Sequence, residues 1–105
     1  MLTLPIKKKW FEMILSGEKK EEYREIKPYY DSRLLNYCRI VALKKYAYDY
    51  WDNPEFEVIF RNGYSSNSPS IKCKVKCSKG YGKEEWGAEP NKEYYVLKIL
   101  SVEKI

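Results

Sequence analysis

The sequence predicts an α+β domain in which about five to six strands form a small mixed barrel, with two or three short helices packed on it. Three observations support this class. The chain has 105 residues, which is enough for one hydrophobic core but too few for two. The expected elements follow the order strand, helix, strand, short helix and then several strands. Turn residues recur at short intervals, so residues 1–105 are predicted to form a single domain.

The N-terminal segment predicts a strand at 2–4 followed by a helix at 5–16. Pro5 suits the first helical turn, and Gly17 suits the left-handed residue just beyond the end of a helix. Apolar residues recur at helical spacing along one side, namely Ile6, Trp10, Met13 and Ile14. This side of the helix is therefore expected to face the core.

A second strand is expected at 20–25, and a short helical piece at 29–35. Because side chains alternate across a strand, Lys20, Glu22 and Arg24 are predicted to share one face. The strand would thus bring an acidic and a basic side chain to the same side of the sheet.

Strands are expected in the remainder of the chain at 39–43, 55–61, 71–77 and 93–103. Phe56, Val58 and Phe60 lie at alternate positions of the strand expected at 55–61, so these three side chains are predicted to share one face. The segment 78–90 is glycine-containing and polar, and it is predicted to be a loop.

The chain has three cysteines and no histidine. An odd number of cysteines is typical of reduced thiols in a cytoplasmic protein. Cys73 and Cys77 alternate with lysines and are predicted to be small core residues, whereas Cys38 lies far away in the sequence. Since zinc-ligand spacing is missing, we expect no metal site and no cofactor.

Lysine and arginine outnumber aspartate and glutamate by 20 to 15, which gives a net charge of +5. Such an excess favours anionic partners such as nucleic acid, although many small proteins carry as much charge for solubility alone. No apolar run reaches the length of a membrane span and no secretory signal is evident, so a cytoplasmic protein without membrane contact is expected. Its oligomeric state is open, with a monomer favoured.

One short segment, residues 17–24, carries a G-x-K-x-x-E-x-R pattern through Gly17, Lys19, Glu22 and Arg24. This pattern resembles the signature of the ASCH domain, a family of the PUA-like superfamily found in bacteria and phages. The segments 85–90 and 94–99 resemble the closing part of small ASCH proteins, so the resemblance spans essentially the whole chain. It implies a PUA-like barrel in which the glycine ends the first helix and the Glu and Arg lie on the next strand.

The chemistry of the motif agrees with a ligand site. Glu22 should stay ionised beside two cations and can accept hydrogen bonds from a base edge or a ribose hydroxyl. Arg24 and Lys19 can hold phosphate, Arg24 through its planar fork. In the structural alternative, Glu22 and Arg24 form a pair that only tethers the strand to the helix.

Further candidate ligand residues lie outside the motif. Trp86 in the late loop either caps the core or closes over a bound base. Arg61 and Tyr64, at the end of a strand, form a second place where side chains are expected to line the cleft. The lysine block 7–9 is either a solvated surface or a phosphate-contacting patch.

These observations predict a module that binds RNA or a modified nucleotide. The alternative is an enzyme, either a hydrolase of acylated nucleosides or a ribonuclease, that uses Lys19 and Glu22 as catalytic residues. Some ASCH amidohydrolases have threonine where this chain has Glu22, so their nucleophile is missing from the matching position. A third possibility is a protein-interaction module that uses the aromatic segment 46–51.

Overall fold

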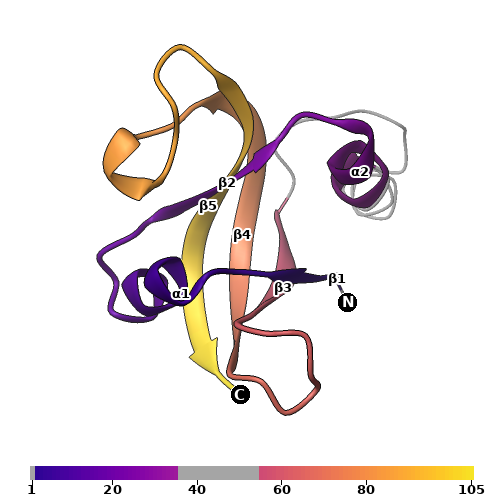
Figure 1. Ribbon diagram of the computed structural model, residues 1–105, viewed down its shortest axis with the longest axis vertical. Helices are drawn as coiled ribbons and strands as arrows, with labels where there is room; N and C mark the ends of the chain where they lie inside the picture. The colour runs from indigo at the N-terminus through magenta and orange to yellow at the C-terminus, as the bar shows by residue number, and fades with distance from the viewer. Residues whose placement is uncertain (1, 36–54) are drawn as a thin grey trace.

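The computed structural model describes residues 2–35 and 55–105 (Figure 1). The expected strand at 39–43, the aromatic segment 46–51 and Cys38 lie outside the described residues. The elements in chain order are β1 (Leu2–Pro5), α1 (Lys8–Leu15), β2 (Glu21–Glu25), α2 (Pro28–Tyr30), η1 (Asp31–Leu35), β3 (Glu55–Arg61), β4 (Ser70–Tyr81), η2 (Glu84–Trp86) and β5 (Glu93–Lys104). None of the described helices is long and apolar enough to cross a membrane.

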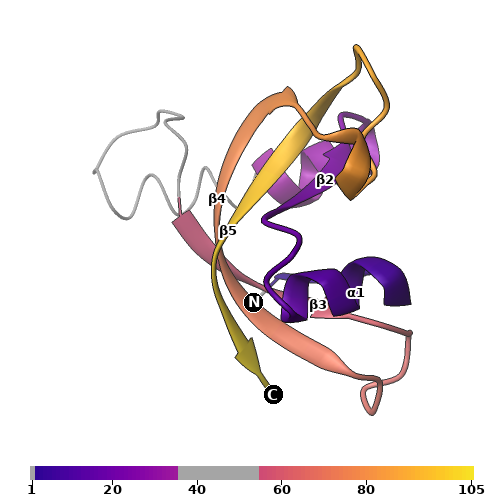
Figure 2. The same ribbon diagram turned by 90° about the vertical axis from the view of Figure 1, so that its left-hand side faces the viewer.

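The described strands form one mixed sheet in the order β1-β3-β4-β5-β2. The β1–β3 pair is parallel, and the other three neighbouring pairs are antiparallel. The sheet is strongly curled, and α1 lies on its concave side (Figure 2). With β1 and β2 at its two edges, the described sheet is a half-barrel of five strands.

The core lies between the concave side of the sheet and α1. Phe56, Val58 and Phe60 share one face of β3 as the alternation predicts, and all three are buried. Cys73 and Cys77 are buried free thiols in the same cluster, which confirms that they serve as small core residues. Burial raises the pKa of the Cys73 thiol to about 12, so this thiol stays protonated at neutral pH.

The N-terminal elements begin and end at different residues from those expected. Pro5 belongs to β1, where it lies opposite Arg61, and not to the helix, which starts at Lys8. A proline is tolerated there because β1 is an edge strand and does not need every donor. Lys20 precedes β2, which begins at Glu21, so Lys20 is exposed while Glu22 and Arg24 share the buried face.

The predicted loop at 78–90 is partly a strand. Strand β4 continues to Tyr81 because its partner β5 is equally long and Tyr81 lies opposite Glu93. The remaining connection contains the short 3₁₀ helix η2, which ends at Gly87 with a φ of 102°. The segment 78–90 therefore combines the end of a strand with a short connection that contains one helical turn.

Gly17 ends α1 as the sequence predicts. Its φ is 85°, a left-handed conformation that favours glycine. The Gly17 amide donates to the carbonyl of Ile14, and the Lys19 amide donates to that of Met13. This tight turn directs Lys19 back toward the sheet, beside the buried face of β2.

Candidate functional site

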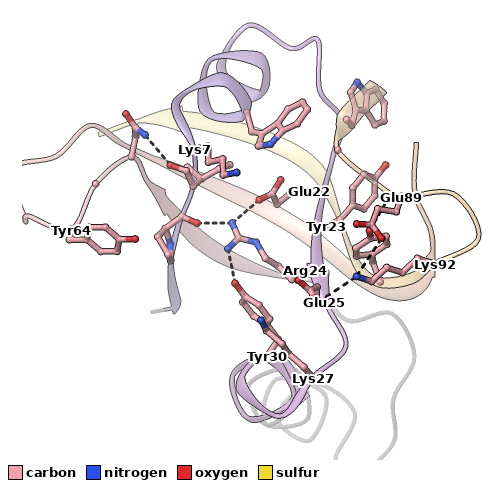
Figure 3. Close-up of a pocket in the computed structure, with 18 residues that line it drawn as sticks. Lys7, Glu22, Tyr23, Arg24, Glu25, Lys27, Tyr30, Tyr64, Glu89 and Lys92 are labelled. Carbon is pink, nitrogen blue, oxygen red and sulfur yellow. Dashed lines mark hydrogen bonds and ion pairs between the residues drawn. The ribbon is translucent and has the colours of Figure 1, made fainter. Parts of the chain in front are cut away.

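A cleft of about 640 Å³ opens between the start of α1, strand β2 and the loops that follow β3 and β4 (Figure 3). Its charged lining residues are Lys7, Glu22, Arg24, Glu25, Lys27, Glu89 and Lys92. Its aromatic lining residues are Trp10, Tyr23, Tyr30, Tyr64, Trp86 and Tyr94. Cavities of this size accept small-molecule ligands, and the charged lining has four cations and three carboxylates.

At the centre of the cleft, Glu22 is held between two cations. Its Oε2 accepts a hydrogen bond from Arg24 Nη2 at 2.6 Å, and its Oε1 lies 3.2 Å from Lys19 Nζ. The three residues are only 1% (Lys19), 5% (Glu22) and 8% (Arg24) exposed. Burying charges is costly unless they are paired, so this chain of contacts is what allows three ionised groups to lie inside the domain.

Arg24 contacts three residues on three elements, Glu22 on β2, Pro5 on β1 and Tyr30 on α2. Its Nη2 also donates to the Pro5 carbonyl of β1 at 2.8 Å, and its Nη1 donates to the Tyr30 hydroxyl of α2 at 3.3 Å. The same guanidinium lies 5.7 Å from the centre of the Tyr30 ring. Its Nε has no hydrogen-bond partner among the described residues, although it is buried.

Lys19 lies behind the wall of the cleft and is not one of its lining residues. Its ammonium donates to the Trp86 carbonyl and lies 4.3 Å from the centre of the Trp10 ring and 5.2 Å from that of Tyr23. Burial lowers the Lys19 pKa below its ordinary 10.5, and the neighbouring Glu22 carboxylate partly opposes this shift. Lys19 thus connects α1, β2 and the η2 loop.

Trp86 lines the cleft and does not belong to the hydrophobic core cluster. The next residue, Gly87, packs on Trp10 so closely that an added Cβ would lie 3.0 Å from Trp10 Cζ2. The loop also donates the Lys83 amide to the Tyr23 hydroxyl at 2.9 Å. These contacts fix the two tryptophans on the same side of the cleft.

The other predicted site residues are separated by the fold. Tyr64 lines one end of the cleft and is 95% exposed. Arg61 is not part of the lining, and its Nε donates to Ser70 Oγ at 3.2 Å. In the lysine block, Lys7 lines the cleft, whereas Lys8 extends from α1 and pairs with Glu12 at 3.7 Å.

Several lining residues were missed by sequence reasoning. Asn62 is not one of them, because it belongs to the strand end at 61–64 where side chains are expected to line the cleft; its Nδ2 donates to the Ile6 carbonyl at 3.0 Å. Trp10 was assigned to the core side of α1, and its ring is shared between core and cleft. Lys92 approaches Glu25 at 3.6 Å only because β2 pairs with β5, and no local pattern indicates that contact.

The arrangement can hold a flat, polar ligand. Glu22 supplies acceptors, Arg24 supplies a donor, and aromatic rings surround them. Within residues 2–35 and 55–105, no group of three or more His, Cys, Asp or Glu could hold a metal ion. Comparisons with protein-family models, curated proteins and solved structures found no match for this chain.

Proposed function

We propose that this domain binds RNA by accommodating an unpaired nucleotide in the cleft, and that a modified nucleotide can occupy the same place. The observation that carries the proposal is the Glu22–Arg24 pair on the lining of an aromatic cleft. A carboxylate and a guanidinium side by side offer both acceptors and donors to a base edge. Recognition of single-stranded RNA generally combines such hydrogen bonds with stacking on aromatic rings.

Aromatic side chains around the cleft support stacking. Tyr64 is 95% exposed, which is unusual for a large ring without a partner, and it stands at one end of the cleft. Trp86 and Tyr30 lie on the lining as well, and both are half-buried. Rings that are held in place but remain accessible can stack on bases without being reorganised.

Cations at the cleft support phosphate contacts. Lys7 and Lys27 are exposed, and neither forms an ion pair with a carboxylate in the described part of the chain. Two lysines of β4 differ, since Lys72 pairs with Glu57 and Glu103 and Lys74 pairs with Glu55. Uncompensated positive charge therefore lies at the cleft, where a phosphate backbone would pass.

The resemblance to the ASCH family gives the same assignment independently. It implies a PUA-like fold and a ligand site built on Lys19, Glu22 and Arg24. These three side chains form one continuous ion-paired chain beside the cleft. Membership of the family is part of the proposal.

The position of Lys19 favours binding over the hydrolase and ribonuclease alternatives. A catalytic lysine must reach the reacting atoms of its substrate. Lys19 is 1% exposed, and its ammonium is already occupied by Glu22 and the Trp86 carbonyl. In this arrangement it supports the cleft from behind.

The proposal is tested by fluorescence anisotropy of labelled single-stranded RNA at several salt concentrations. We expect log affinity to fall linearly with log salt. Tyr64→Ala should weaken binding roughly tenfold, because one stacked base is worth about 1 to 3 kcal/mol. The matched control is Tyr81→Ala, which removes a tyrosine that is 70% exposed but lies outside the cleft lining. The proposal fails if no RNA binds at low salt, or if both variants lose affinity equally.

A further inference from the structure

The centre of the cleft has hydrogen-bonding capacity that the described residues leave unused. An ionised carboxylate offers about four acceptor positions on its two oxygens. Glu22 uses one on each oxygen, Oε1 for Lys19 and Oε2 for Arg24. Each oxygen therefore keeps acceptor capacity for a ligand in the cleft that Glu22 lines.

Next to the Glu22 carboxylate, Arg24 Nε is a donor without a hydrogen-bond partner among the described residues. This nitrogen is buried without a partner among the described residues, while Nη1 and Nη2 of the same guanidinium are bonded. Buried polar atoms are nearly always satisfied, so an unpaired one on a residue that lines the cleft is the candidate donor to a ligand acceptor.

We propose that this site selects guanine. The inference rests on the proposed function and deepens it, because it names the base that the cleft accepts. The unused groups are two carboxylate oxygens next to one donor nitrogen. The Watson–Crick edge of guanine offers the complement, with the N2 amino group and N1–H as neighbouring donors and O6 as the adjacent acceptor.

The other bases leave part of the site unsatisfied. Adenine and cytosine each carry one amino group beside a ring-nitrogen acceptor, so they satisfy one carboxylate oxygen and Arg24 Nε. Uracil has a single N–H between two carbonyl groups, and its second carbonyl would face the carboxylate. A site built to accept two donors discriminates strongly against a ligand that lacks one, because the unpaired group stays buried.

The guanine can belong to RNA or to a free guanine nucleotide, because both present the same edge. The lysines at the cleft, Lys7 and Lys27, contact phosphate in either case. The two sources are distinguished by comparing a guanine-containing heptanucleotide with guanosine monophosphate. A clearly tighter complex with the heptanucleotide assigns the site to RNA, and equal affinity assigns it to the free nucleotide.

The test measures binding of labelled heptauridine in which the central base is guanine, hypoxanthine, adenine, cytosine or uracil. Hypoxanthine keeps N1–H and O6 but lacks the N2 amino group. We expect guanine to bind about tenfold more tightly than hypoxanthine, and hypoxanthine to bind no more weakly than the other three bases, since a good base contact is worth roughly tenfold or more. The five monophosphates are measured alongside.

Two matched variants accompany the series. Glu22→Gln replaces one acceptor by a donor and should reduce the preference for guanine to less than about threefold, while circular dichroism and thermal melting verify the fold. Glu25→Gln changes a cleft carboxylate that pairs with Lys92, and it should keep the guanine preference. If Glu22→Gln does not fold, the affinities of the unmodified protein for the five central bases still show whether the site prefers guanine.

The outcomes separate this inference from the proposed function. Equal affinity for all five central bases overturns guanine selection and leaves RNA binding standing. Preference for a base other than guanine also overturns it. Absence of binding by every oligonucleotide and every monophosphate overturns both proposals.

Discussion

Arg24 of β2 donates a hydrogen bond to the main-chain carbonyl of Pro5 in β1 at 2.8 Å, and so joins the two edge strands of the described sheet. Among the described residues these strands share no backbone pairing, since β1 pairs with β3 and β2 pairs with β5. A side chain thus spans the open side of the half-barrel. Because the same guanidinium holds Glu22, the closure of the fold and the centre of the cleft depend on one residue.

We predict that Arg24→Lys destabilises the domain by about 2 to 3 kcal/mol, because an ammonium cannot contact Pro5, Glu22 and Tyr30 together and hydrogen bonds to charged groups contribute most of such losses. Urea denaturation followed by circular dichroism measures the free energy of unfolding. Arg61→Lys is the matched control, since the Arg61 side chain forms one hydrogen bond within residues 2–35 and 55–105, to Ser70, and the variant should lose less than about 1 kcal/mol. Equal losses would show that Arg24 does not bridge the strands in solution.

Gly87→Ala should destabilise the domain by about 1 to 2 kcal/mol. Its φ of 102° disfavours a side chain, and the new Cβ would press on the Trp10 ring at 3.0 Å. The same urea titration, followed by tryptophan fluorescence, measures the loss and reports any displacement of Trp86. Gly80→Ala serves as the control, because its nearest contact would be an ordinary 4.0 Å to Val96 Cγ2. A stable Gly87→Ala protein with unchanged fluorescence contradicts the close packing of this loop.

The contribution of Lys19 to the free energy of unfolding should increase with pH in the alkaline range. Burial lowers the Lys19 pKa in the folded state, while the unfolded chain keeps the ordinary 10.5. Between those two values the unfolded state binds more protons, so this residue's contribution to stability rises with pH up to 10.5. The variant Lys19→Met carries no titratable group at this position, so it lacks this pH-dependent contribution.

The free energy of unfolding of wild type minus that of Lys19→Met should therefore increase between pH 8 and pH 10. Urea titrations of both proteins at the two pH values give the difference, and the other titrating groups cancel because they are common to both. A difference that decreases over this range would mean that attraction to Glu22 outweighs burial, opposite to the direction inferred from the structure.

Lys27→Ala should reduce the salt dependence of RNA binding. Each phosphate contact with a single strand contributes roughly 0.7 to the slope of log affinity against log salt. Lys76→Ala removes the same charge from an exposed position of β4 outside the cleft lining, and its slope should remain that of the wild type. Anisotropy titrations at four salt concentrations provide both slopes. Identical slopes for the two variants would indicate that net charge, and not the cleft, attracts RNA.

Local patterns predicted much of the fold because they depend only on neighbours in the chain. Alternation placed Phe56, Val58 and Phe60 on one face of a strand, and the turn at Gly17 follows from the tolerance of glycine for positive φ. The ends of elements were less predictable. Strand β4 extends to Tyr81 because a distant strand pairs with it, and that partner is invisible in the local sequence.

The sequence by itself determined that Glu22 and Arg24 share one face, because two-residue periodicity in a strand is a local property. Only the tertiary structure decided that Arg24 reaches the cleft while Lys19 lies behind its wall, and that Trp86 and Tyr64 line the cleft whereas Arg61 does not. These outcomes depend on strand register and on how two loops pack against α1. Such long-range contacts join residues whose separation in the chain leaves no periodic signal, so folding alone brings them together.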